Sequence, residues 1–250
     1  MSFGRDAEGP DGSTAGAEGV KESGRRRGLV GGDPGRKAQR DFGFKLTHPL
    51  FLDLTGNPDA SSELGAFLAG GSDAHCRRHL EIGFGRGRFL VELATMRAAD
   101  RLVGVEVRKG LCQSALSRCE NAGVDNVRVV YGDVRALLGQ FPKASLDAVY
   151  FMFPDPWWKK KHHKKRVLDV EMFEMLRPYL REGATILVRS DVPLVIELAR
   201  EGFGAHPWLV PLVEAPYPTP MTDREVVCRR LGTPVEEVWC SYRPNGEVIG

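Results

Sequence analysis

The feature that most restricts the fold of this chain is a regular alternation of short apolar runs with amphipathic stretches. Five apolar runs have the length and composition of buried strands: HLEIGF (79–84), RLVGVEV (101–107), NVRVVYGD (126–133), LDAVYFMF (146–153) and ATILVRS (184–190). Amphipathic stretches lie between them: GRFLVELATMRA (87–98), RKGLCQSALSRCENAG (108–123), VRALLGQF (134–141) and VLDVEMFEMLRPYL (167–180). Strands and helices that alternate in this way indicate a parallel sheet covered on both faces.

The pattern changes after the stretch DVPLVIELAREG (191–202). Two further runs, HPWLVPLVEA (206–215) and VEEVWCSYRP (235–244), are typical of strands, and we expect them to form an antiparallel hairpin at the sheet edge. The sequence therefore predicts an α/β, Rossmann-like fold with a mostly parallel seven-stranded sheet, helices on both faces and an antiparallel C-terminal edge. Sheets of this kind bind ligands beyond the carboxyl ends of their strands.

Residues 1–43 differ in composition from the rest of the 250-residue chain. They are rich in Gly, Ser, Arg and acidic residues and have almost no aliphatic side chains. Such a segment cannot bury enough apolar surface to offset its ordering entropy, so we expect a disordered Gly/Arg-rich tail before one domain over 44–250. The cluster Arg25–Arg27 within the tail is either a solvated group of charges or a contact for a nucleic-acid backbone.

Charge and cysteine usage narrow the class of protein. The net charge is only +2, so an anionic partner can be argued only from where the charges lie. None of the five cysteines forms a C-x-x-C pair, which argues against a zinc or thioredoxin-like site and suits a reducing compartment. The N-terminus has no apolar signal region and no stretch approaches membrane-spanning length. We expect a cytoplasmic protein without a membrane partner or a metal.

A glycine-rich loop, within LEIGFGRGRFL (80–90), joins the first strand to the first helix. Gly83, Gly85 and Gly87 allow a tight turn and a close approach of the backbone to a ligand. A dinucleotide-binding fingerprint would need glycine or alanine at position 88, which is Arg88, and a P-loop would need G-K-[ST]. The loop therefore fits a nucleoside-type ligand that lacks a pyrophosphate.

Three acids follow or precede this loop at positions that suit such a ligand. Glu81 lies two residues before the first loop glycine, where a carboxylate favours a cation over a phosphate. Glu106 ends the second strand, where an acid binds ribose hydroxyls, and Asp133 ends the third, where it is either an acceptor for an adenine amino group or simply a helix N-cap. S-adenosylmethionine, an adenosine that carries a sulfonium cation, matches all these groups.

The stretch FPDPWWKKKHHKKR (153–166) follows the fourth strand. Two prolines flank Asp155 and restrict the backbone, so the carboxylate is held at one place at the carboxyl end of the sheet. A rigid turn without chemistry is the alternative. Trp157 and Trp158 offer faces on which a base can stack, unless one of them packs under the loop.

Eight consecutive basic residues, Lys159 to Arg166, come next. A run of this kind is often only a solvated face. Here it adjoins the expected ligand crevice in a nearly neutral protein, which indicates a polyanionic substrate with phosphates. The neighbouring aromatic rings favour an unpaired or splayed nucleotide over a plain duplex.

With these motifs the sequence resembles the TrmB-type tRNA (guanine-N7-)-methyltransferases of bacteria, a class I methyltransferase family that uses S-adenosylmethionine. The resemblance runs from about Leu80 to Tyr242 and rests on LEIGFGRG, VGVEVRKG, FPDPWWKKKHHKKR and TDREVVCRRLGTPVEEV in the family's order. It implies methyl transfer to N7 of a guanosine, typically position 46 in the variable loop of tRNA. Separately, we expect the protein to be a monomer or homodimer.

The resemblance also implies roles for individual residues. It assigns cofactor contacts to Glu81, Glu106, Asp133 and Asp155, with Asp155 also the catalytic residue. It assigns substrate contacts to Lys159, Asp191, Thr222 and Glu225. It assigns tRNA contacts to Lys160, Lys161, His162, His163, Lys164, Lys165 and Arg166. Two departures stand out: the family's folded N-terminal extension is hard to recognise in RDFGFKLTHPLFLDLTG (40–56), and Asp223 and Arg224 replace a lysine and an aromatic residue within T-x-x-E.

Other functions compete with this interpretation. Enzymes that methylate the amino group of adenine have sites resembling [DN]-P-P-[YFW], which P-D-P-W fits poorly, and a small-molecule methyltransferase would leave the basic run unexplained. A non-catalytic RNA-binding module on the same fold would not need the glycine loop, Glu106 and Asp155. A protein-interaction domain that uses KKKHHKKR as a localisation signal would not need the run to adjoin the crevice.

Overall fold

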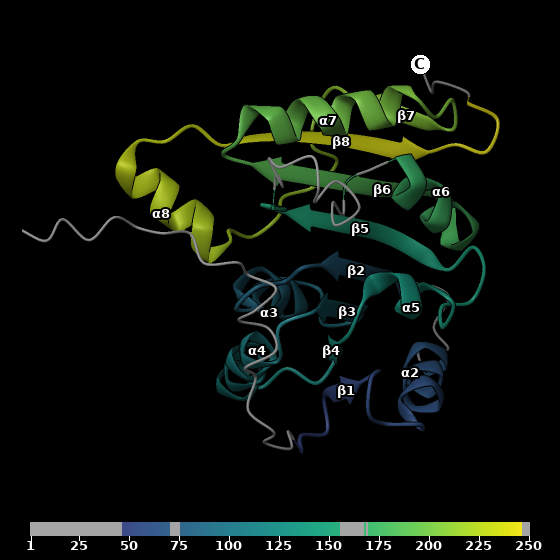
Figure 1. The fold of residues 1–250 in the computed structure, drawn as a ribbon, viewed down its shortest axis with the longest axis vertical. Helices are drawn as coiled ribbons and strands as arrows, with labels where there is room; N and C mark the ends of the chain where they lie inside the picture. Colours follow the sequence, from purple (N-terminus) through teal and green to yellow (C-terminus); the bar gives the residue numbers. More distant parts are fainter. Residues whose placement is uncertain (1–46, 71–75, 156–167, 169, 247–250) are drawn as a thin grey trace, which may run out of the picture. The chain divides into compact units, whose positions relative to one another are not determined.

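The computed structural model describes residues 47–70, 76–155, 168 and 170–246 (Figure 1). The expected tail (1–43), the start of the expected domain (44–46) and the stretch from Pro156 to Val167 lie outside these residues. The strands are β1 (Phe51–Asp53), β2 (Arg78–Ile82), β3 (Arg101–Glu106), β4 (Val127–Tyr131), β5 (Leu146–Met152), β6 (Leu180–Ser190), β7 (Leu209–Leu212) and β8 (Glu236–Tyr242). The helices are α2 (Ala60–Ala69), α3 (Arg88–Met96), α4 (Lys109–Ala122), α5 (Val134–Leu138), α6 (Val170–Leu176), the 3₁₀ helix η2 (Arg177–Tyr179), α7 (Pro193–Gly204) and α8 (Asp223–Leu231).

The strands form one mixed sheet in the order β1-β4-β3-β2-β5-β6-β8-β7. Strands β1 to β6 pair in parallel, and β8 is antiparallel to both of its neighbours. The α/β, Rossmann-like architecture is confirmed, but the expected number of seven strands is wrong because the sheet has eight. The additional strand is β1, which pairs with β4 through Phe51 and Val129. It has three residues, of which only Leu52 is buried, too few to show a strand pattern in the sequence.

The C-terminal edge is antiparallel, as the sequence predicts, although its connection is not a simple hairpin. Strand β8 lies between β6 and β7, and residues 213–235 join β7 to β8. This connection contains α8, which the sequence did not reveal because only Glu225 and Cys228 of the helix are buried, while its apolar residues Val227 and Leu231 are exposed. Figure 1 shows α8 at the end of the sheet toward which the arrows of β2, β5 and β6 point.

Helices cover both faces of the sheet over two apolar clusters. Side chains of α2, α5, α6 and α7 pack on one face, and those of α3 and α4 pack on the other. Alternate residues of a strand face opposite sides, so Leu80 and Ile82 enter the first cluster while Glu81 faces α3 and α4. The sheet therefore places Glu81 directly under the helix that follows the glycine loop.

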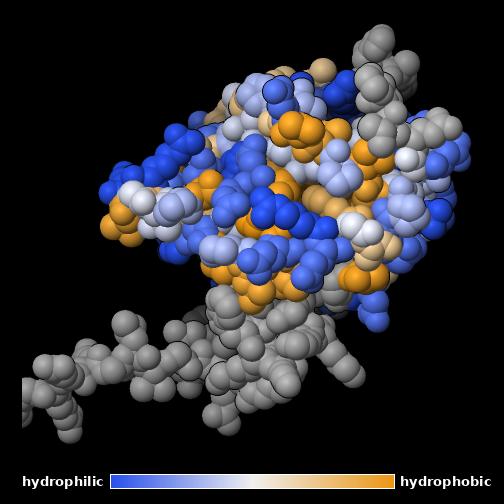
Figure 2. Space-filling view, turned by 90° about the horizontal axis from the view of Figure 1, so that it is seen from above, coloured by the Kyte–Doolittle hydropathy of each residue, from blue (hydrophilic) through white to orange (hydrophobic). Residues whose placement is uncertain are grey.

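Apolar side chains on the face seen in Figure 2 form several separate patches among hydrophilic ones. None of the helices in the described ranges has the length and apolar character needed to cross a membrane.

Candidate cofactor and substrate site

A cavity of about 410 Å³ lies at the carboxyl ends of the parallel strands. Its walls come from the glycine loop, the start of α3, the end of β5 and the N-terminus of α8. The residues that line it are Glu81, Gly83, Phe84, Gly85, Arg86, Arg88, Phe89, Arg108, Leu111, Met152, Phe153, Thr222, Asp223 and Arg224. The cavity thus brings together segments that lie far apart in the sequence, at the place where α/β sheets bind ligands.

The glycine loop has a backbone that other residues adopt rarely. Gly83, Gly85 and Gly87 have φ angles of 76°, 58° and 79°. A Cβ atom on Gly87 would lie 2.5 Å from the Cβ of Ala115 in α4, so this glycine also permits close packing of α3 and α4. Apart from its chain neighbours, no atom of the residues that the structure describes lies within 4 Å of a Cβ built on Gly83 or Gly85, which leaves that side of the loop open to a ligand.

Glu81 is a buried acid without a partner. Its side chain is 2% exposed, and neither carboxylate oxygen has a hydrogen-bond donor among the described residues. Burial, and next the negative charge of Glu106, raise the pKa of Glu81 to about 8. Because a buried carboxylate is costly unless a cation or donors compensate it, this residue fits the positively charged end of a ligand in the cavity.

Glu106 differs from Glu81 because its carboxylate has three donors. The backbone N–H of Gly85 donates to Oε2 at 3.2 Å, and the backbone N–H and Nε of Arg108 donate to Oε1 at 3.0 and 3.2 Å. The acid at the end of β3 therefore holds the glycine loop in place. Its side chain is buried, and the residues that line the cavity include its partners Gly85 and Arg108 but not Glu106 itself.

Asp133 is exposed and caps helix α5. Its side chain accepts a hydrogen bond of 2.8 Å from the backbone N–H of Arg135. The residues that line the cavity do not include it. Asp133 is thus the helix N-cap that the sequence offered as one of its two possible roles. A carboxylate that caps a helix can still accept a hydrogen bond from a further donor.

Asp155 follows a sharp turn at the end of β5. Phe153, two residues earlier, has φ of 52°, a left-handed conformation that is strained for a bulky residue. The N–H of Phe153 donates to the carbonyl of Arg189 at 2.8 Å, which fixes the turn against β6. Met152 and Phe153 line the cavity and Asp155 is exposed just beyond them. Pro156, Trp157, Trp158 and the basic residues Lys159 to Arg166 lie outside the described residues.

The segment from Thr222 to Glu225 forms the N-terminus of α8. The hydroxyl of Thr222 accepts from the backbone N–H of Glu225 at 3.0 Å and caps the helix. Asp223 accepts from Arg118 of α4 at 3.1 Å with both carboxylate oxygens. Arg224 donates to Asp191, the residue after β6, from both Nε and Nη2. Two ion pairs therefore join α8 to the rest of the site.

Glu225 is part of a buried ion-pair network. Nη1 of Arg189 donates to Oε2 of Glu225 at 2.9 Å, and Arg229 donates to Oε1 at 2.9 Å. Arg189 also bonds Glu237 of β8, the hydroxyl of Thr219 and the carbonyl of Pro220. No pattern in the sequence indicates this role for Arg189, since a lone arginine in a strand run does not identify its partners.

Asp191 carries a negative charge that Arg224 stabilises. Burial alone would raise the pKa of this carboxyl group, but the hydrogen bonds and the charge of Arg224 outweigh burial and lower it. The same pair raises the pKa of Arg224. Across the described ranges, no cluster of His, Cys, Asp and Glu side chains has the arrangement of a metal site.

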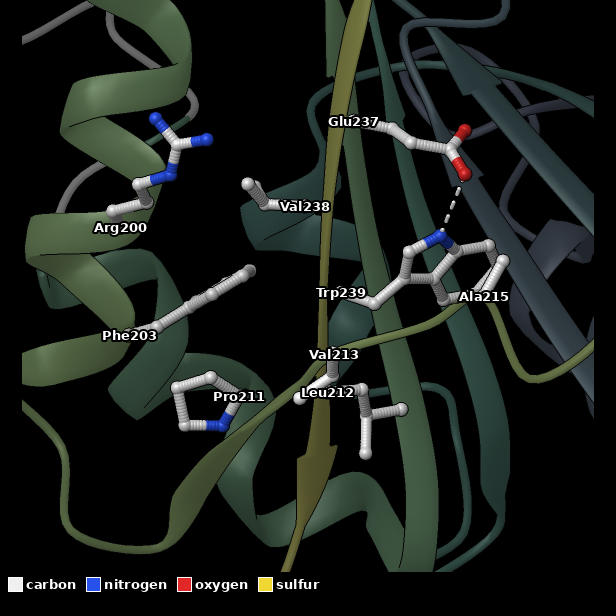
Figure 3. A pocket seen from close by; sticks show the side chains of 9 residues that line it. All are labelled: Arg200, Phe203, Pro211, Leu212, Val213, Ala215, Glu237, Val238 and Trp239. Carbon is white, nitrogen blue, oxygen red and sulfur yellow. Dashed lines mark hydrogen bonds between the residues drawn. The ribbon is translucent and has the colours of Figure 1, made fainter.

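A second cavity, of about 460 Å³, lies between α7 and the strands β7 and β8 (Figure 3). Its lining residues are Arg200, Phe203, Pro211, Leu212, Val213, Ala215, Glu237, Val238 and Trp239. The indole N–H of Trp239 donates to Glu237 at 3.0 Å, as the dashed line in Figure 3 marks. None of the residues that the sequence singled out lies here, so this cavity is not the candidate site.

Comparison with known proteins gives a consistent result. Residues 76–238 match a family model described as "Putative methyltransferase". A curated protein from Synechococcus sp. (strain JA-3-3Ab), named tRNA (guanine-N(7)-)-methyltransferase, is 34% identical over 171 residues, which cover 66% of this chain and 72% of that protein. A protein of the same name from Microcystis aeruginosa (strain NIES-843 / IAM M-2473) is 34% identical over 167 residues, 63% of this chain and 79% of its own.

A solved structure has the same fold. The aminoglycoside resistance methyltransferase NpmB1 aligns with a TM-score of 0.50 and 16% identity, over 73% of this chain and 93% of that one. At this identity the likeness concerns the fold alone.

Proposed function

Because the chain belongs to the methyltransferase family that includes the curated tRNA (guanine-N(7)-)-methyltransferases, we propose that it methylates N7 of guanosine in tRNA. The target that we propose is guanosine 46 of the variable loop. The observation that carries the proposal is the match to a protein of that name over 72% of its length. The cavity beside the glycine loop supports it, since it contains the buried carboxylate of Glu81, which has no hydrogen-bond partner within the described part of the chain.

S-adenosylmethionine is the cofactor of this chain and, when bound, supplies a methyl group carried on a sulfonium cation. The residues at the cavity fit it. Glu81 offers a negative charge to the cationic end, and the open side of the loop at Gly83 and Gly85 admits close contact. In this proposal Gly87 keeps α3 packed against α4, Glu106 holds the ribose hydroxyls and Asp133 accepts from the adenine amino group.

The reaction places modest demands on acid–base chemistry. N7 of guanine has an in-plane lone pair and no proton, so a general base is not needed. The residues of the site have to align the base for in-line attack, which is catalysis by positioning. We assign Asp155 the role of a fixed carboxylate that favours the positive charge developing on the base or holds its N–H edge. Its place beyond the Phe153 turn supports this assignment.

Substrate contacts come from both sides of the cavity in this proposal. Thr222 lines the cavity, and Asp191 lies beside Arg224, which also lines it. The carboxylate of Glu225 is already bound by Arg189 and Arg229, so we propose that it serves the substrate by fixing α8. Lys159 is assigned to the target nucleotide, and Lys160 to Arg166 to the phosphates of the tRNA.

The cellular location and the oligomeric state of the protein remain predictions. The five cysteines all lie in the described part of the chain, where they are buried and form no disulfide, which agrees with the cytoplasmic location that we propose for a tRNA-modifying enzyme. The chain is expected to act as a monomer or homodimer.

The proposal is tested by incubating the full chain with labelled S-adenosylmethionine and unmodified tRNA transcripts. One transcript has guanosine at position 46 and the other has a substituted variable loop. Cleavage at N7-methylguanosine then locates the label. Label at guanosine 46 that disappears on substitution supports the reaction and the position, and label at another guanosine supports the reaction but contradicts the position. Cofactor binding without transfer to either transcript contradicts the proposed substrate.

A further inference from the structure

The ion pair between Arg224 and Asp191 joins two segments beside the cavity. Nε of Arg224 donates to Oδ2 of Asp191 at 3.1 Å, and Nη2 donates to the same oxygen. The side chain of Asp191 is 9% exposed, whereas that of Arg224 is 55% exposed and lines the cavity. Because both donors reach one oxygen, the carboxylate retains acceptor capacity for another donor.

The backbone around Arg224 is anchored on both sides. Thr222 caps the helix, Asp223 is bound by Arg118, and Glu225 is bound by Arg189. The backbone from which the Arg224 side chain extends is therefore held in place. A planar guanidinium that donates two hydrogen bonds restricts the orientation of its partner more strongly than an ammonium group does.

A charged, oriented carboxylate suits one edge of guanine. The Watson–Crick edge of guanine presents an N1–H and an N2 amino group as donors, and a carboxylate can only accept. N7 lies on the opposite edge of the base, so a contact at the Watson–Crick edge leaves N7 free for methyl transfer. Adenine lacks both of these donors, and inosine lacks only the amino group.

We propose that Arg224 is a positioning residue that orients the Asp191 carboxylate to accept from the N2 amino group of the target guanine. This inference rests on the proposed function and adds to it the residue that determines selectivity for guanine. Arg224 acts through Asp191 and does not itself touch the reacting atoms.

The test compares two tRNAs, prepared by ligation, that differ only in guanosine or inosine at the target position. Values of kcat/KM are measured for the wild-type chain, Arg224→Ala, Arg224→Lys and Asp191→Asn. The intrinsic difference in reactivity between guanine and the inosine base is the same for the wild-type chain and every variant. A change in the ratio of kcat/KM for guanosine to kcat/KM for inosine therefore reports on the contact to the amino group. A hydrogen bond to a charged group contributes about ten- to a hundredfold to such a ratio.

We expect Arg224→Ala to reduce kcat/KM with guanosine by about tenfold or more while the value with inosine changes little. Arg224→Lys restores part of the ratio, and Asp191→Asn abolishes the preference. Arg230→Ala, an exposed substitution on the same helix, is the matched control and leaves both values unchanged. Binding of S-adenosylhomocysteine to each variant, measured by calorimetry, verifies that the cofactor site is intact.

A charge-swapped chain, Asp191→Arg with Arg224→Asp, distinguishes two roles of the ion pair. In one, Arg224 orients the Asp191 carboxylate toward the base; in the other, the pair only holds the two segments together. It keeps an ion pair between the two segments but moves the carboxylate, so we expect the guanosine preference to stay lost. Recovery of the preference by the swap would overturn the inference. An equal loss on guanosine and inosine in Arg224→Ala, or an unchanged ratio, would overturn it as well. If the wild-type chain methylates neither tRNA, the proposed function fails together with the inference.

Discussion

Glu81 on β2 and Glu106 at the end of β3 project from the same face of the sheet, and among the residues that the structure describes only Glu106 of these two buried carboxylates finds hydrogen-bond donors. Two acids so placed differ in what they can do for a ligand. Glu106 organises the loop, whereas Glu81 can give up its proton and offer a full negative charge when a cation binds.

The first prediction concerns stability as a function of pH in the ligand-free chain. Folding raises the pKa of Glu81 from 4.5 to about 8. The folded state therefore holds this proton more tightly, so the favourable contribution present below pH 4.5 is lost as the pH rises toward 8. We expect Glu81→Gln to raise the free energy of unfolding at pH 8 by about 2–4 kcal/mol and to change it little at pH 5.

Urea denaturation at the two pH values measures this difference, and Glu201→Gln on the exposed side of α7 serves as the control. An equal effect of Glu81→Gln at pH 5 and pH 8 would contradict the assignment.

The second prediction concerns protons released on cofactor binding. At pH 7 the ligand-free Glu81 is largely protonated, and a cation beside it lowers its pKa. Binding of S-adenosylmethionine should therefore release up to about one proton. Calorimetry in buffers with different ionisation enthalpies measures the number released, and Glu81→Gln should bind weakly and release none. A wild-type binding enthalpy that does not depend on the buffer would contradict the predicted release of a proton from Glu81.

The third prediction concerns Gly87. Alanine there would combine a φ of 79° with a Cβ only 2.5 Å from the Cβ of Ala115. We expect Gly87→Ala to destabilise the chain by about 1–3 kcal/mol and to weaken cofactor binding. Gly139→Ala is the matched control. There φ is −60° and no atom of the described residues lies within 4 Å of the added Cβ. The stability of the Gly139→Ala chain should therefore equal that of the wild type or be slightly higher. Thermal unfolding of both variants measures the difference. Similar melting temperatures for Gly87→Ala and Gly139→Ala would contradict the close packing of Gly87 against Ala115.

The fourth prediction concerns the two arginines that bind Glu225. Arg189 is buried and Arg229 is exposed. Arg189→Met leaves the buried carboxylate of Glu225 uncompensated on one side and should cost about 3–5 kcal/mol. Arg229→Ala removes an exposed partner and should cost about 0–1 kcal/mol. Chemical denaturation measures both, and a large loss for Arg229→Ala would show that the network is arranged differently.

The fifth prediction concerns Asp155. An asparagine there keeps the shape of the side chain but removes the charge, so we expect Asp155→Asn to lower kcat by about a hundredfold or more. Cofactor binding should fall far less, which single-turnover and binding measurements separate. Asp125→Asn, an exposed substitution before β4, is the control. Undiminished turnover in Asp155→Asn would remove this residue from the mechanism.

The sequence predicted those parts of the site that depend on local pattern. The glycine loop, Glu81 and Glu106 lie in or directly after strands whose apolar runs are unambiguous. The structure places Glu81, Gly83 and Gly85 in the lining of the cavity and Glu106 in a hydrogen bond with Gly85. The eighth strand and α8 were missed for a common reason. Strand β1 has three residues and α8 buries only two, so neither has the apolar periodicity by which sequence patterns reveal an element.

The contacts of Arg189, Arg118 and Arg224 could not be predicted for a different reason. Each of these arginines pairs with an acid at least 33 positions away in the chain, and local propensity carries no information about such partners. The T-x-x-E pattern illustrates the limit: its spacing also describes a helix N-cap, and the structure realises that cap through Thr222.

The position of β8 has a consequence for how the protein is made. The strand that reaches the sheet last in the sequence does not lie at its edge but between β6 and β7. A nascent chain that has emerged only as far as β7 therefore lacks the strand against which β7 pairs, and Arg189 lacks its partner Glu237. The final part of the sheet is assembled from contacts distant in sequence, which form slowly. The antiparallel end of the sheet can therefore form only once β8 has emerged from the ribosome.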